Sequence, residues 1–213
     1  MKMDKFPLAM SGWAYLLATV ALAGVASALG VWWMAWPLWL IAAWMAWFFR
    51  DPARDSQAGP EAVIAPADGK IVAVQEVACP ELPGGRARLV SIFMNIFDVH
   101  VNRLPVGGQV VSVAHQAGDF DPADQPQVSR GNERQEIVIA SDRGHALLVV
   151  QVAGLVARRI ECWLTPSQIV HRGQRFGMIR FGSRVDVYLP LQAMVQVSLG
   201  QKVKAGETVI GAL

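Results

Sequence analysis

The sequence is organised around the stretch Met178-Ile-Arg-Phe-Gly-Ser-Arg-Val-Asp-Val-Tyr-Leu-Pro190. The run at 185–189, rich in valine, predicts a strand. The pair Gly182-Ser183 stands just before it. Such a pair between two strand-like runs usually forms a turn, because glycine adopts backbone angles that other residues avoid and serine caps turns. The rest of the chain decides whether this pair also does chemistry.

Further strand-like runs precede this stretch. Segments rich in Val and Ile, punctuated by Gly, Pro and Asp, predict strands at 70–77, 89–93, 109–113, 136–140 and 146–152. Two glycine-led phrases, at 171–179 and 199–210, echo each other. The second is similar to a turn-strand phrase of the barrel-sandwich hybrids, the fold of lipoyl and biotinyl carrier domains. We expect a compact, mainly β domain with barrel-sandwich-hybrid-like features over 61–213.

The N-terminal part differs in kind. Hydrophobic residues make up 53% of the chain, and no residue from Phe6 to Phe49 carries a charge. At about 20 residues per membrane crossing, this run is too long for one span and predicts a transmembrane helical hairpin with helices at 11–29 and 31–49. Pro37 is expected to kink the second helix or to shift its start. A secretory signal peptide would have a shorter apolar region, and a buried core hairpin is the alternative that stays open.

Positive charges flank the apolar run on both sides. They are Lys2, Lys5, Arg50 and Arg54. This distribution favours both ends of a hairpin on the cytoplasmic side, so we expect residues 1–50 to anchor the protein in the cell (inner) membrane. Residues 51–60 have the turn-former composition of a linker, and the β-rich domain then lies on the cytoplasmic side.

Composition also excludes some functions. A formal net charge of +2 without a basic run gives no reason to expect nucleic acid as a partner. The two cysteines, Cys79 and Cys162, lack the CxxC spacing of a metal site, and the four histidines are scattered. We therefore expect no metal and reduced thiols.

Polar motifs stand between the apolar runs in a fixed order. They are Ala-Pro-Ala-Asp-Gly-Lys at 65–70, Phe-Met-Asn-Ile-Phe-Asp-Val-His-Val-Asn-Arg-Leu-Pro at 93–105, Gly-Asn-Glu-Arg at 131–134, and the Gly-Ser stretch. Together they resemble the phosphatidylserine decarboxylase family, particularly its short form, over nearly everything after Phe48. The resemblance implies a lyase of phospholipid biosynthesis that is made as a zymogen and converts phosphatidylserine to phosphatidylethanolamine and CO2.

The same resemblance gives Ser183 a double role. By autocatalytic serinolysis, Ser183 Oγ attacks the carbonyl of Gly182, and the chain is cut into a large β chain, 1–182, and a small α chain, 183–213. Ser183 becomes a covalent pyruvoyl group, the cofactor. Its ketone forms a Schiff base with the substrate amine and withdraws electrons from the carbon that loses CO2.

A serine nucleophile needs a base, and the base needs an orienting group. By the resemblance, His100 and Asp68 complete a Ser-His-Asp arrangement with Ser183. Asp98 competes with Asp68, because it lies two residues from His100 and would share its face on a strand. The choice between Asp68 and Asp98 stays open.

Other polar residues are candidates for binding the substrate. Arg103 stands where longer family members carry a second histidine, and its guanidinium suits a phosphate or a carboxylate. The remaining candidates are Asn132, Glu133, Arg134 and His115. The implied partners are a phospholipid, the membrane and the two chains of one precursor, while a homo-oligomer is left open.

Other functions remain in competition. A membrane-anchored carrier module would be modified on Lys202 or Lys204, although neither has the flanking residues of a lipoyl or biotinyl site. A pyruvoyl decarboxylase of another amine would share the Gly-Ser chemistry. A serine hydrolase would use Ser183 unprocessed, but no G-x-S-x-G elbow surrounds it.

Overall fold

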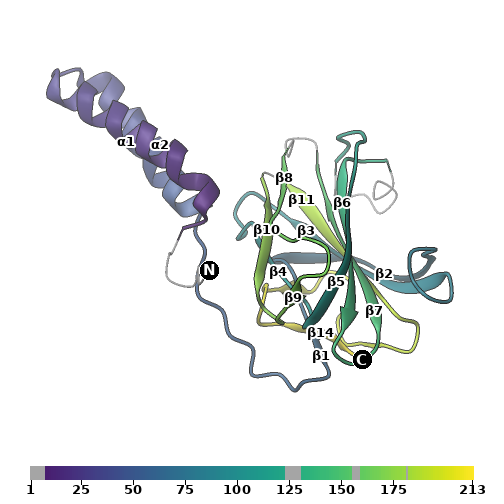
Figure 1. Ribbon diagram of the computed structural model, residues 1–213. Helices are drawn as coiled ribbons and strands as arrows, with labels where there is room; N and C mark the ends of the chain where they lie inside the picture. The colour runs from purple at the N-terminus through teal and green to yellow at the C-terminus, as the bar shows by residue number, and fades with distance from the viewer. Residues whose placement is uncertain (1–7, 123–130, 155–158, 181) are drawn as a thin grey trace. The chain divides into compact units, whose positions relative to one another are not determined.

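The computed structural model describes residues 8–122, 131–154, 159–180 and 182–213. The chain divides into two compact units, Met1–Ala53 and Arg54–Leu213. Figure 1 shows a helical hairpin in the first unit and a curled, mainly β fold in the second.

The first unit is a pair of helices. A short 3-10 helix, Met10–Gly12, leads into α1 (Trp13–Ala28), and α2 (Trp32–Phe48) follows. The two α-helices fall within the ranges expected at 11–29 and 31–49. Gly30 lies between them at φ +72°, in the left-handed region that favours glycine. Pro37 lies inside α2.

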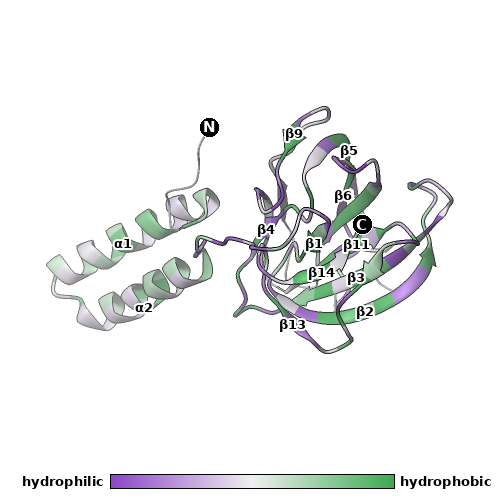
Figure 2. Ribbon diagram, turned by 90° about the horizontal axis from the view of Figure 1, so that it is seen from below, coloured by the Kyte–Doolittle hydropathy of each residue, from purple (hydrophilic) through white to green (hydrophobic). Residues whose placement is uncertain are grey.

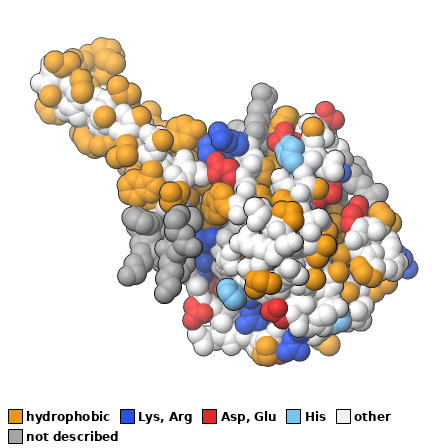
Figure 3. Space-filling view, viewed as in Figure 1, with side chains coloured by type: hydrophobic (Ala, Val, Ile, Leu, Met, Phe, Trp, Pro, Cys, Tyr) orange, Lys and Arg blue, Asp and Glu red, His pale blue; other side chains and the backbone are white. Residues whose placement is uncertain are grey.

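Many large apolar side chains along the two helices are exposed. Ala23, Ala35 and Ala42 are buried, whereas Trp33 is 77% exposed and Leu40 is 64% exposed. Figure 2 shows both helices in green and pale colours, and Figure 3 shows hydrophobic side chains along their visible face. Small residues at the contact and large apolar residues outside are typical of helices that pack in lipid.

One helix meets the length of a membrane span. Among the described residues, Met10–Ala28 is a 19-residue helical segment that is long and apolar enough to cross a membrane. The second helix, α2, has 17 residues. At about 1.5 Å per residue its length is roughly 25 Å, slightly less than the hydrocarbon core of a bilayer.

The second unit is built from short and long strands. They are β1 (Ala62–Ile64), β2 (Gly69–Ala78), β3 (Arg86–Met94), β4 (Val101–Arg103), β5 (Gly108–Gln116), β6 (Arg134–Ser141), β7 (Ala146–Val152), β8 (Ile160–Cys162), β9 (Ile169–Val170), β10 (Arg175–Ile179), β11 (Ser183–Leu189), β12 (Met194–Val195), β13 (Lys202–Val203) and β14 (Val209–Ala212). The expectation of a mainly β domain is confirmed.

Within the described residues, the strands form one large sheet and two small ones. The large sheet has the order β13-β2-β3-β11-β7-β6-β5-β9, and all its pairs are antiparallel. It curls into a half-barrel, as Figure 1 shows. The small sheets, β4-β10-β8 and β1-β14-β12, add their side chains to the core of the half-barrel.

Alternation along the strands gives the large sheet two faces. One face carries the main core, which includes Val90, Ile92, Ile137, Val149, Val185 and Val187, together with Phe176, Ile179 and Ile210 from the small sheets. Ser183 has the same parity as Val185 and therefore belongs to this core face. The opposite face packs a smaller cluster that includes Leu82, Ala87 and Val150.

The antiparallel register collects strand ends at one end of the large sheet. Met94, the last residue of β3, lies opposite Ser183, the first residue of β11. Val152, the last residue of β7, lies opposite Arg134, the first residue of β6. Since β2 starts at Gly69 beside the end of β3, it joins the same group. We call this edge the Ser183 end of the sheet.

Candidate active site

The Gly-Ser junction combines an unusual backbone with a buried hydroxyl. Gly182 has φ +56°, and a Cβ at this position would meet no atom within 4 Å. Glycine is therefore favoured here by the left-handed backbone conformation and not by a lack of space for a side chain. Ser183 is fully buried, and its Oγ lies 3.6 Å from Met94 Sδ, a weak acceptor.

Two amide side chains lie in the same buried place. Asn102 of β4 donates from Nδ2 to Met94 Sδ at 3.7 Å, so it shares this sulfur with Ser183 Oγ. Gln151 of β7 donates from Nε2 to Asn102 Oδ1 at 2.8 Å. Asn102, Gln151, Met94 and Ser183 are all fully buried. Sequence reasoning did not select Asn102 or Gln151, although a glutamine inside the apolar run at 146–152 was a signal.

His100 is fully buried and directly precedes β4. β4 pairs with β10, and Val101 lies opposite Met178. This register places His100 near the end of β10, and β10 ends a few residues before Ser183 in the chain. His100 and Ser183 therefore approach the same end of the domain from two sheets.

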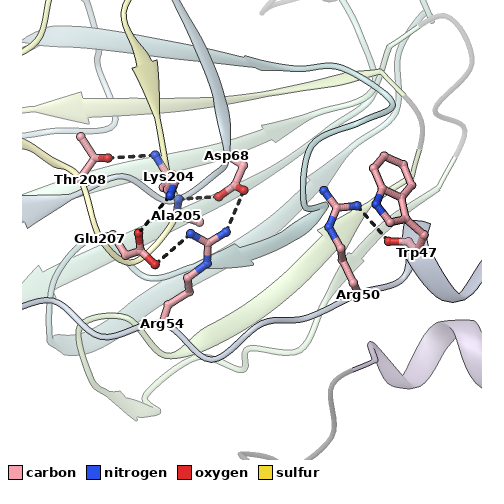
Figure 4. A network of polar contacts seen from close by, with 8 residues as sticks. All are labelled: Trp47, Arg50, Arg54, Asp68, Lys204, Ala205, Glu207 and Thr208. Atoms are coloured by element: carbon pink, nitrogen blue, oxygen red, sulfur yellow. Dashed lines mark hydrogen bonds and ion pairs between the residues drawn. The ribbon is translucent and has the colours of Figure 1, made fainter.

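Asp68 directly precedes β2 and lies at the Ser183 end of the sheet. Its Oδ1 accepts from the Ala205 backbone N–H at 2.7 Å, and its Oδ2 lies 3.0 Å from Arg54 Nη2. Arg54 also binds Glu207, at 2.9 Å, as Figure 4 shows. The largely buried carboxylate therefore joins residues 204–207 to the start of β2. Asp98, its competitor, accepts from the Asn95 backbone N–H at 2.9 Å within the turn after β3.

Arg103 and Asn132 are buried, and both hold backbone. Arg103 Nη1 donates to the Gly173 carbonyl at 3.2 Å. Asn132 Nδ2 donates to the carbonyls of Asp121 and Ala153, each at 2.8 Å. Asn132 therefore ties the segment after β5 to the end of β7, next to the Ser183 end of the sheet.

The other substrate-binding candidates lie at the same sheet end. His115 is near the end of β5, and its Nε2 lies 4.0 Å from Glu133 Oε1. Arg134, the first residue of β6, pairs with Glu136 at 2.7 Å. Between β5 and this group, residues 123–130 lie outside the described part of the chain.

A buried ion pair stands directly behind the junction. Arg184 Nε lies 3.0 Å from Asp186 Oδ1, and both side chains are fully buried. They point to the face of the sheet opposite Ser183, since the side chains of successive strand residues alternate. The pair therefore lies at the start of β11, just after the Gly-Ser junction.

These features define a class of protein: a mainly β domain with a buried serine after a left-handed glycine, preceded by an apolar helical hairpin. The sequence model of the family described as phosphatidylserine decarboxylase matches residues 41–211. The chain belongs to the phosphatidylserine decarboxylase family, and the resemblance noted from its motifs is confirmed.

Individual relatives match almost end to end. The phosphatidylserine decarboxylase proenzyme of Magnetococcus marinus is 44% identical over 208 residues, which covers 97% of this chain and 95% of the relative. That of Nitrosomonas europaea is 47% identical over 203 residues, covering 95% and 94%. That of Cupriavidus pinatubonensis is 46% identical over 208 residues, covering 97% and 95%.

Proposed function

We propose that this chain is a proenzyme that cuts itself between Gly182 and Ser183 and then decarboxylates phosphatidylserine. As a member of its family it is a pyruvoyl-dependent carboxy-lyase. The observation that carries the position of the cut is the left-handed Gly182 followed at once by a fully buried serine at the start of a strand.

The cut is a rearrangement of the chain's own bonds. Ser183 Oγ loses its proton and attacks the Gly182 carbonyl carbon, so an ester C–O bond replaces the peptide C–N bond. Removal of the Ser183 α-proton breaks the Cβ–Oγ bond and frees the carboxylate of Gly182. Water then hydrolyses the remaining enamine, which releases ammonia and leaves the pyruvoyl group. That group supplies an electron sink for the substrate amine.

The position of the junction suits a two-chain enzyme. Ser183 is the first residue of β11, and this strand pairs with β3 on one side and β7 on the other. A cut before Ser183 leaves both ladders intact. The small chain, 183–213, therefore stays in the sheet without a covalent link to the large chain.

His100 is the proposed base for Ser183 and the proton donor to the substrate carbon. Its burial beside the end of β10 supports this role, because β10 ends only a few residues before Ser183 in the chain. Asp68 is the proposed orienting group, because its motif at 65–70 matches the family. An ionised carboxylate has about four lone-pair positions, so Asp68 can accept a further N–H besides those of Arg54 and Ala205.

The remaining polar residues have proposed roles in binding. Arg103, Glu133, Arg134 and His115 are candidates to meet the phosphate and carboxylate of the headgroup. Asn132 would act by shaping the loop at 119–121, given its backbone contacts. A substrate that carries both anionic groups matches the guanidinium chemistry of this set.

Membrane attachment is proposed for the helical hairpin. Exposed tryptophans and leucines, small residues at the helix contact, and the apolar segment Met10–Ala28 support it. We place the anchor in the inner membrane and the β domain on the cytoplasmic side, because Lys2, Lys5 and Arg50 flank the apolar run. The barrel-sandwich-like architecture stays a prediction of the sequence, which leaves association into a homo-oligomer open.

A second feature suits a lipid substrate. The turn after β3 exposes Ile96 and Phe97, which is 64% exposed. Two side-chain hydrogen bonds to the backbone stabilise this turn: Asn95 Oδ1 accepts the Phe97 N–H at 2.7 Å, and Asp98 Oδ2 accepts the Asn95 N–H. Because Met94 lies opposite Ser183, the apolar turn stands near the junction and can meet the bilayer that holds the substrate.

The test is decarboxylation of carboxyl-labelled phosphatidylserine in vesicles by the full-length chain. We expect the wild-type protein to release labelled CO2 and Ser183→Ala to release none. Ser112→Ala is the control, because Ser112 lies in β5 and is exposed. Release of CO2 by Ser183→Ala at the wild-type rate would overturn the proposal.

A further inference from the structure

We propose that Asn102, held in place by Gln151, donates a hydrogen bond to the oxyanion that forms on the Gly182 carbonyl oxygen when Ser183 attacks. This role rests on the proposed self-cleavage and adds a part to it. The evidence is a chain of buried contacts from the backbone of β8 to the reactive hydroxyl.

The chain of contacts fixes which way the amides point. The Glu161 backbone carbonyl can only accept, and Gln151 Nε2 lies 3.4 Å from it. The same Nε2 donates to Asn102 at 2.8 Å, so the atom it meets is Asn102 Oδ1. Asn102 Nδ2 is thereby turned toward Met94 Sδ, the atom that Ser183 Oγ also contacts. The Asn102 donor and the Ser183 nucleophile thus contact the same sulfur atom.

The fold makes room for this arrangement. A Cβ on Gly177 would lie 2.8 Å from Gln151 Nε2 and 2.2 Å from the Glu161 carbonyl oxygen. Gly177 lies opposite Asn102 on one side and Cys162 on the other. Its missing side chain therefore lets Gln151 reach from the large sheet to the small one.

The Asn102 side-chain amide makes only a weak hydrogen bond as a donor. Within the described residues, the acceptor for Asn102 Nδ2 is a thioether sulfur at 3.7 Å, which is a weak acceptor. Gln151 Oε1 is also buried without a hydrogen-bond partner among those residues. Buried amides left this poorly satisfied are costly, and a negative oxygen at the neighbouring junction would use the Asn102 donor fully.

The step needs such a donor. When Ser183 Oγ bonds to the Gly182 carbonyl carbon, its proton passes to the base and the carbonyl electrons move onto the oxygen. The charged oxygen then expels the Ser183 nitrogen, which takes up a proton. Ser183 is fully buried, so a hydrogen-bond donor fixed by the protein is suited to stabilise the charge.

The test follows the cut in full-length chain made by cell-free synthesis, with and without hydroxylamine, which cleaves esters but leaves peptide bonds intact. Asn102→Leu keeps the size and removes the donor. We expect it to slow the cut by about a hundredfold to a thousandfold, as for loss of one oxyanion donor. Hydroxylamine should not speed it, because formation of the ester is itself the slowed step. Gln151→Leu should slow the cut less, since it only frees the Asn102 amide.

Gln135→Leu is the matched control. Gln135 is a buried glutamine on β6, directly opposite Gln151, on the same face of the sheet. It should be cut at the wild-type rate. Asn102→Asp is a second variant: it keeps the shape, replaces the donor with an acceptor, and should be cut as slowly as Asn102→Leu. Melting temperatures show which variants are folded.

Two results would overturn the inference. One is a cut in folded Asn102→Leu or Asn102→Asp within about threefold of wild type. The other is rapid cleavage of either variant by hydroxylamine, which would show that the ester forms without the Asn102 donor. If the wild-type chain itself were never cut, the proposed function would fail instead.

Discussion

The left-handed backbone of Gly182 makes a quantitative prediction for Gly182→Ala. At φ +56° an alanine costs roughly 1–2 kcal/mol relative to glycine. Its Cβ meets nothing within 4 Å, so no clash adds to this cost. Since about 1.4 kcal/mol is a factor of ten, the reactive backbone conformation should become about tenfold rarer. We therefore expect the cut to be slowed about tenfold, but not abolished.

Gly84→Ala is the control for this experiment. Gly84 has φ +86°, also has no atom within 4 Å of a Cβ, and lies in the turn between β2 and β3. The backbone cost is similar, but the junction is untouched. The assay is the time course of the two fragments on gels, with a melting curve for each variant. A wild-type rate of cutting in Gly182→Ala, or an equally slow cut in Gly84→Ala, would refute the reasoning.

Three other predictions concern stability, reactivity and the membrane. Arg184→Met removes the ion-pair partner of the buried Asp186 carboxylate and should lower the free energy of unfolding, measured in urea, by about 3–5 kcal/mol. The double variant Arg184→Met with Asp186→Leu should recover most of this loss. A double variant as unstable as the single one would argue against the pair. Burial, reinforced by the neighbouring Glu81 carboxylate, raises the pKa of the Cys79 thiol to about 12, so the thiol is protonated at pH 8 and iodoacetamide should label it only after unfolding. Labelling of folded protein at the rate of a free thiol would contradict this. Phe97→Ser should slow the decarboxylation of phosphatidylserine in vesicles but not that of a short-chain, monomeric phosphatidylserine. The control Leu199→Ser, at an exposed leucine in another loop, should change neither rate. Equal losses of Phe97→Ser on both substrates would point to damage of the site itself.

Long periodic segments could be predicted from the sequence, and short ones could not. The runs at 70–77, 136–140 and 146–152 lie within β2, β6 and β7, because each has enough apolar residues to show a pattern. Strands such as β9 and β12 have two residues each. They exist because a partner strand pairs with them, and two residues carry no period of their own.

The residues of the candidate site also differ in whether the sequence could predict them. The Gly182-Ser183 junction, His100 and Asp68 belong to sequence motifs, and strand register brings them toward one end of the domain. The contact between Gln151 and Asn102 joins two sheets across 49 residues of chain. Nothing local in the run at 146–152 tells that its glutamine turns inward to meet an asparagine, so only the fold reveals this pair.

The most direct test of the central claim is the intact mass of the purified, denatured protein, handled without amines or reducing agents that attack ketones. We predict two chains, 1–182 and 183–213, with the short chain lighter by one ammonia than a serine-ended fragment. A single uncut chain of 213 residues, in a preparation that releases CO2 from phosphatidylserine, would contradict the account.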